Sequence, residues 1–107
     1  MVPRARLLAA APKALWLDGA SERASVVEVR APDSVGLLAR VAFALTLAGL
    51  HVVNARCSTL GVEVVDAFYV TEADGSLVTD QTRRATVLDA LERAAAASAA
   101  ETSATSS

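Results

Sequence analysis

The chain has 107 residues, of which 53% are hydrophobic, and ten Lys and Arg residues stand against twelve Asp and Glu. This length allows one domain, and the net charge of -2 argues against a nucleic-acid surface, which needs a basic face. No apolar run approaches the roughly 20 residues of a membrane span, so we expect a cytoplasmic protein without membrane contacts. The single cysteine, Cys57, excludes an internal disulfide.

Composition divides the chain into three parts. Residues 1–12 are expected to form a flexible leader, and residues 98–107 are small and polar, which predicts a disordered tail. Residues 13–97 are predicted to form the single folded domain. The domain opens with two expected strands, 13–17 and 25–30, separated by the turn signal Asp18-Gly19. We expect these strands to form an antiparallel hairpin with the first strand at the edge of a sheet.

A helix is predicted over residues 37–48. Pro32 and Gly36 interrupt the preceding strand, and Gly49 is expected to cap the helix at its C-terminus. The only polar side chains of this helix belong to Arg40 and Thr46. Because a helix that packs on one sheet normally keeps a wider polar face, the pattern predicts that a second subunit or domain covers its outer side.

Two further strands are expected over residues 50–60 and 62–71, joined at Gly61. In the first, alternation predicts one buried face and one more polar face, with the buried face formed by Val53, Ala55, Cys57 and Thr59. The second is apolar on both sides, which is typical of a central strand. A final helix should begin near Thr79 or Asp80, either of which can cap it.

The expected order is therefore ββαββα. Two helices on one face of a four-stranded antiparallel sheet make an α+β sandwich. This arrangement is similar to a ferredoxin-like unit in which the last strand has moved to the front of the chain.

The sequence offers no catalytic or metal-binding constellation. One histidine and one cysteine cannot make a structural zinc site, and His51 and Cys57 should lie about 20 Å apart along one strand and point to the same side. Cys57 is predicted to be a small buried apolar residue. Four carboxylates show no paired spacing, and we expect solvated or capping roles for Asp33, Glu28, Glu63 and Asp66. We therefore expect a protein that is not an enzyme and needs no metal or cofactor.

The turn before the first helix is the candidate ligand site. Backbone N–H groups at a helix N-terminus attract anions, including carboxylates, and here they belong to Val35, Gly36, Leu37 and Leu38. Asp33 is expected to cap the helix, and it can also accept a hydrogen bond from a ligand ammonium.

Three segments together resemble an ACT domain, the small ligand-sensing module of amino-acid metabolism. They are Asp33-Ser-Val-Gly-Leu-Leu38, Ala48-Gly-Leu-His-Val52 and Val64-Val-Asp-Ala-Phe-Tyr-Val70. Further motifs, around Trp16 and in Ala55-Arg-Cys-Ser-Thr-Leu-Gly61, resemble the C-terminal ACT domain of the PII uridylyltransferases. That resemblance implies allosteric regulation in nitrogen metabolism through amino-acid binding, with glutamine favoured, and without the catalytic domains of such enzymes.

The resemblance also implies a site and a partner. ACT ligands lie between the strand-to-helix turn of one domain and a core strand of its mate, which predicts a homodimer or pairing with another ACT domain. The corresponding residues here are Asp33, Ser34, Val35, Gly36, Leu37, Leu38 and His51. Where the family turn usually carries Arg-Pro before its glycine, this chain has Ser34-Val35. The alternative is therefore an interaction module, or a truncated remnant of such an enzyme, that binds no ligand.

Overall fold

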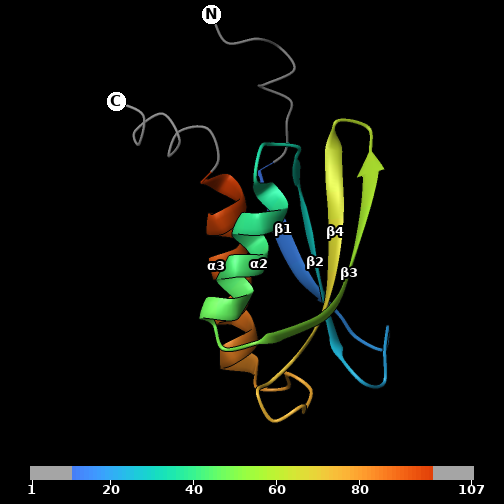
Figure 1. Ribbon diagram of the computed structural model, residues 1–107, viewed down its shortest axis with the longest axis vertical. Helices are drawn as coiled ribbons and strands as arrows, with labels where there is room; N and C mark the ends of the chain where they lie inside the picture. Colours follow the sequence, from blue (N-terminus) through green and yellow to red (C-terminus); the bar gives the residue numbers. More distant parts are fainter. Residues whose placement is uncertain (1–10, 98–107) are drawn as a thin grey trace, which may run out of the picture.

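The computed structural model describes residues 11–97, which form two layers (Figure 1). One layer is a four-stranded antiparallel sheet in the order β1-β2-β4-β3, and the other consists of two helices packed on one face of that sheet. The elements are β1 (Lys13–Leu17), β2 (Ser25–Pro32), α2 (Leu37–Leu47), β3 (His51–Leu60), β4 (Glu63–Thr71) and α3 (Gln81–Ala96). The predicted α+β sandwich of order ββαββα is confirmed. The tail predicted for residues 98–107, and most of the predicted leader, lie outside the described residues.

The hairpin of β1 and β2 places β1 at one edge of the sheet, as predicted. Its register pairs Lys13 with Arg30 and Leu17 with Val26. At the other side of β2 lies β4, which pairs with both β2 and β3, and its side chains alternate between buried and half-buried up to Val70 because the helices cover one face of the sheet. The prediction of a central strand over this segment is therefore confirmed.

The core lies between the sheet and the two helices. It is formed by side chains that point inward from β2 and β4 and by one stripe from each helix, because alternation in a strand and the 3.6-residue period of a helix each select one face. None of the following is more than 3% exposed: Val27, Val29, Ala31, Leu37, Val41, Leu45, Leu50, Phe68, Val70, Val78, Val87 and Leu91.

A glycine ends α2 one residue earlier than the sequence pattern predicts. Gly49 adopts a φ of 84°, and its N–H donates to the carbonyl of Thr46 at 2.9 Å. The N–H of Leu50 donates to the carbonyl of Leu45 at 3.1 Å. These two bonds form a Schellman motif, in which a residue with positive φ lets the chain turn back over the last helical carbonyls.

Strand β3 departs most from its prediction, because all ten of its residues are exposed. The expected buried face of Val53, Ala55, Cys57 and Thr59 is therefore wrong. The physical reason is position: β3 is the outer edge of the sheet, and in Figure 1 it diverges from the helical layer along its length. A register shift between Val52 and Asn54 also interrupts the alternation on which the prediction relied.

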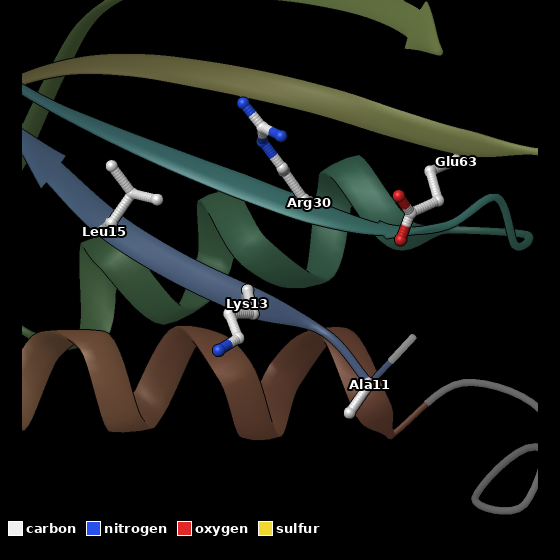
Figure 2. A pocket seen from close by; sticks show the side chains of 5 residues that line it. All are labelled: Ala11, Lys13, Leu15, Arg30 and Glu63. Carbon is white, nitrogen blue, oxygen red and sulfur yellow. The ribbon is translucent and has the colours of Figure 1, made fainter. Parts of the chain in front are cut away.

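The sheet face opposite the helices is open. Figure 2 shows Leu15, Arg30 and Glu63 on this face, where they line a cavity of about 290 Å³ together with Ala11 and Lys13. Arg30 already forms an ion pair with Glu28 at 2.8 Å. The cavity thus carries charges of both signs, and we assign no ligand to it.

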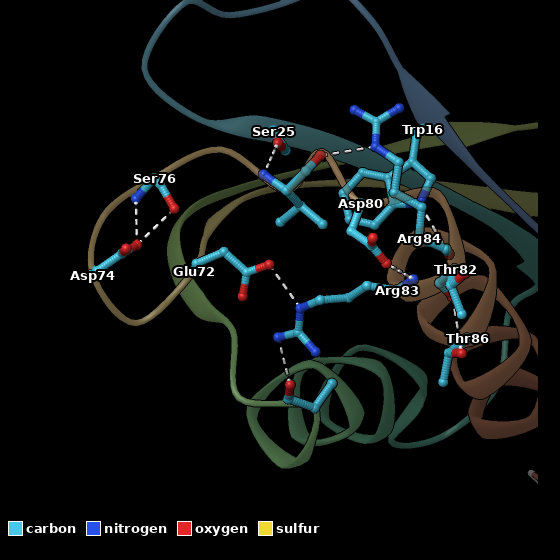
Figure 3. Close-up of polar contacts among 12 residues, drawn as sticks. Trp16, Ser25, Glu72, Asp74, Ser76, Asp80, Thr82, Arg83, Arg84 and Thr86 are labelled. Carbon is cyan, nitrogen blue, oxygen red and sulfur yellow. Dashed lines mark hydrogen bonds and ion pairs between the residues drawn. The ribbon is translucent and has the colours of Figure 1, made fainter.

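Arg83 joins three elements at one end of the domain (Figure 3). Its Nε donates to Glu72 Oε2 at 2.7 Å, and its Nη2 donates to the carbonyl of Ala48 at 2.8 Å. Its backbone N–H donates to Asp80, which caps α3 at 2.8 Å. One of the two predicted caps is thereby confirmed, and the end of α2 is tied to the start of α3.

Arg84 holds the edge strand β1 against α3. Its guanidinium lies 5.1 Å from the centre of the Trp16 ring, and its Nη1 donates to Asp18 at 2.9 Å. The indole N–H of Trp16 donates in return to the Arg84 carbonyl at 3.1 Å. Stacking and hydrogen bonds together attach the short strand β1 to the helical layer.

None of the helices in the described region has the length and apolar character to cross a bilayer.

The substitution Arg83→Ala should destabilise the domain by about 2 kcal/mol, because it removes two charge-assisted hydrogen bonds from partly buried groups. The matched control is Arg93→Ala, which removes only the exposed pair with Asp89 on the surface of α3 and should cost about 0.3–0.5 kcal/mol. Urea denaturation of both variants measures the difference. Equal losses would contradict the role of Arg83 as the link between α2, α3 and Glu72.

Candidate functional site

A cavity of about 360 Å³ lies where β2 passes into α2. The turn, the first turn of the helix and two strands contribute to its wall. The lining residues are Asp33, Ser34, Gly36, Leu37, Leu38, Ala39, Cys57, Val64 and Asp66. Five of the seven residues predicted for the ligand site, Asp33, Ser34, Gly36, Leu37 and Leu38, are thus brought together, while Val35 projects into solvent with 97% of its surface exposed.

The N-terminus of α2 at this cavity has no side-chain cap. Gly36 occupies the N-cap position with a φ of 76°, and the Leu37 N–H closes the turn by donating to the Ser34 carbonyl at 3.2 Å. The expectation that Asp33 caps the helix is wrong, because the backbone of the turn closes on itself and leaves the carboxylate outside the cap position. The positive end of the helix dipole therefore faces the cavity, and no carboxylate of the chain caps it.

Arg40 braces this turn, a role that the sequence analysis missed. Its Nη1 donates to the Val35 carbonyl at 2.6 Å and its Nη2 to Ser34 Oγ at 3.0 Å. Its Nε donates to the carbonyl of Ala94 in α3 at 2.9 Å. The signal in the sequence was the presence of a single charged residue on a helix whose only other polar side chain is that of Thr46.

The cavity contains a buried carboxylate. Asp66 is 1% exposed, and Cys57 Sγ lies 2.5 Å from its Oδ1, so that the thiol donates to the carboxylate. The expected solvated or capping role of Asp66 is wrong because its side chain points inward from the central strand, between Val64 and Phe68. The expected burial of Cys57 is also wrong, since edge strand β3 leaves the thiol exposed. An Asp at an inward position of an apolar strand was the available signal.

The carboxylates raise the pKa of the Cys57 thiol. The largest cause is the hydrogen bond to Asp66, followed by partial desolvation of the thiol and then by the negative charges of Asp66 and Asp33. A thiolate in this place would lose its donor hydrogen and would face two carboxylates. Cys57 is therefore held in its protonated form and serves as a donor to Asp66, and it is not an activated nucleophile.

His51 lies in a different cavity of the same chain. This second cavity, of about 540 Å³, is lined by His51 together with Thr46, Gly49, Leu50, Val52 and Ala73. Because of the bulge, His51 pairs with Thr71 while Cys57 pairs with Asp66. Thr71 and Asp66 are an odd number of positions apart on β4, so their side chains point to opposite faces of the sheet. His51 and Cys57, which lie opposite them, therefore also point to opposite faces, and the expectation that they point to the same side is wrong. A contact between His51 and the turn of another subunit stays a prediction.

The fold and the cavity at the strand-to-helix turn define a member of a known class. The family model for the ACT domain matches residues 25–96. The chain belongs to the ACT domain family, and the match covers every element except β1.

Curated relatives of this chain are bifunctional uridylyltransferase/uridylyl-removing enzymes. The enzyme of Phenylobacterium zucineum is 38% identical over 92% of the chain, and that of Streptomyces coelicolor is 49% identical over 61% of it. The enzyme of Mycobacterium tuberculosis is 48% identical over 59% of the chain. The chain spans only 8% to 11% of the length of these three relatives. No solved structure gives a significant match.

Alkylation of Cys57 should follow a pH profile whose midpoint lies above that of a cysteine in an unstructured peptide. Asp66→Asn should lower this midpoint, because it removes the largest cause of the raised pKa. The midpoint is obtained from the rates of reaction with iodoacetamide at different pH values, and no other thiol contributes because Cys57 is the only cysteine.

The same pKa has a consequence for stability. Because the pKa of Cys57 is higher in the folded state than in the unfolded state, this thiol contributes stability that is fully present below the unfolded-state pKa. The contribution is lost as the pH rises through the folded-state pKa.

An alkylation midpoint at or below that of the unstructured peptide would contradict the hydrogen bond from Cys57 to Asp66.

Proposed function

We propose that this ACT domain is a regulatory module that binds an amino acid in the cavity between the Asp33–Leu38 turn and strands β3 and β4. The observation that carries the proposal is the pairing of an uncapped helix N-terminus with carboxylate side chains in one cavity. An amino acid is a zwitterion, and its carboxylate suits the helix N-terminus while its ammonium suits the acidic side. The volume, about 360 Å³, falls in the range of small-molecule sites.

Glutamine is the amino acid that we favour. The resemblance to the C-terminal ACT domain of the PII uridylyltransferases implies glutamine sensing, and the similarity to bifunctional uridylyltransferase/uridylyl-removing enzymes supports this choice. The domain would act by reporting the presence of its ligand to a partner domain.

We also propose that the domain pairs with a second ACT unit, either another copy or a related domain, through β3. This strand forms one of the two edges of the sheet, and all ten of its residues are exposed. The exposed edge of a strand presents unpaired N–H and C=O groups that another strand can bond. Val53, at 61% exposure, adds apolar surface to that edge.

Antiparallel pairing of two β3 strands would bring the start of one β3 to the cavity end of the other domain. If the symmetry axis passes between Ala55 and Arg56, residue 51 of one strand lies opposite residue 60 of the other. Leu60 is at the end of the sheet where β2 enters the turn, because Pro32 and Leu60 both pair with Glu63. The start of the second strand would then lie at the end of the sheet that carries the cavity of the first domain, with its residue 51 on the same face as Leu60.

A second candidate function is that of an interaction module without a ligand. The exposed outer face of α2 favours it, since Phe43 is 62% exposed and Leu47 is 71% exposed one helical turn away. The Ser34-Val35 departure from the usual family turn supports the same candidate. Association without any response to amino acids would select this second candidate.

Glutamine should raise the unfolding midpoint of the purified chain. A ligand that binds only the folded state at about 100 times its Kd adds about 2.7 kcal/mol to the free energy of unfolding. The substitution Leu38→Trp enlarges a side chain in the cavity wall and should abolish the response, whereas Leu77→Trp, in the loop before α3, should keep it. A thermal-shift titration over the standard amino acids tests this, and a flat response to all of them would refute amino-acid binding.

Charge introduced at the sheet edge should prevent pairing. Val53→Asp replaces an exposed apolar side chain of β3 by a carboxylate, which pairing would cover opposite Ser58 without a compensating cation, and it should shift the chain to monomers. Ala20→Asp, in the loop beyond the opposite edge of the sheet, is the matched control and should leave association unchanged. Sedimentation velocity over a range of micromolar concentrations measures both. A wild-type chain that stays monomeric throughout would contradict self-pairing through β3.

A further inference from the structure

We infer that Asp66 is the group that recognises the ammonium of the ligand, so that the cavity selects amino acids over their deaminated analogues. This inference rests on the proposed function of the cavity and assigns a specificity-determining residue within it. The residues predicted from the sequence include Asp33 but not Asp66.

The first argument is the burial of a carboxylate that has no cation beside it. Asp66 is 1% exposed, yet it forms part of the cavity wall. None of the ion pairs within residues 11–97 includes it. Burying a carboxylate is costly unless a positive charge or several hydrogen bonds compensate it. A ligand ammonium in the cavity would supply that charge.

The second argument is the weakness of the donor that the protein itself provides. The hydrogen bond that the structure gives the Asp66 side chain comes from Cys57, and a thiol is a weak donor. Arg40, the cation beside the turn, directs its donors to Val35, Ser34 and Ala94. The guanidinium therefore shapes the cavity wall but does not neutralise the carboxylate.

The third argument compares the two acidic residues of the cavity. Asp33 is exposed, so water screens its charge, whereas Asp66 lies in a low-dielectric environment where a charge pair is stronger. Both carboxylates act on the same thiol, since each raises the pKa of Cys57. A cation placed near Cys57 would feel both charges, and the buried one would hold it more strongly.

The test compares two ligands on three proteins by isothermal titration calorimetry, using the full chain. Glutamine carries the α-ammonium, and glutaramic acid is the same molecule without it. The wild type should bind glutamine roughly 10- to 100-fold more tightly, as expected of a hydrogen bond to a buried charged group. Asp66→Asn should abolish this preference, while the matched control Asp33→Asn should keep most of it.

The outcomes separate this inference from the proposed function. If Asp66→Asn still prefers glutamine by the wild-type factor, Asp66 does not recognise the ammonium, although the cavity remains a binding site. If the wild type binds glutamine and glutaramic acid equally, the inference is likewise overturned. Failure of the wild type to bind glutamine would overturn both proposals for this ligand.

A second measurement needs no substitution, in case Asp66→Asn does not fold. Bound glutamine should lower the midpoint of the pH profile of Cys57 alkylation, because the ammonium offsets the carboxylate that raises the thiol pKa. Glutaramic acid should not lower it. A midpoint that glutamine leaves unchanged at saturation would overturn the inference.

Discussion

The left-handed backbone of Gly36 is the constraint on which the cavity depends. It lets β2 pass into α2 through a turn closed by backbone bonds, so no side chain occupies the helix N-terminus. A Cβ at this position would lie 3.4 Å from the Arg40 guanidinium and would require a strained φ. The direction of α2, the open amides of its first turn and the position of Arg40 all follow from this one residue.

The strand and helix positions could be predicted because they depend on local signals. Alternation and β-branched residues located the four strands, and Asp80 marked the start of α3. The exposure of β3 could not be predicted, because alternation shows which side chains share a face but not whether a helix covers that face. The bulge at Val53 adds a second reason, since a single extra residue reverses the alternation beyond it.

The candidate site was predictable in its backbone and only partly in its side chains. The turn from Asp33 to Leu38 is continuous in sequence, so its residues were found together. Asp66 joins them only through the pairing of β4 with β2 and β3, and its one signal in the sequence is a carboxylate at an inward position of an apolar strand. His51 lies in another cavity of the chain, and its proposed role depends on a second subunit.

Arg40 also gives the domain a mechanical link between its cavity and the last turns of α3. The guanidinium that shapes the cavity wall donates its third hydrogen bond to the carbonyl of Ala94, near the end of that helix. Carbonyls near a helix C-terminus lack intrahelical donors, so the bond to Arg40 supplies one of the few restraints there. The position of the strand-to-helix turn and the position of the last turns of α3 are therefore tied together by one side chain, so a change at the cavity would act on both helices.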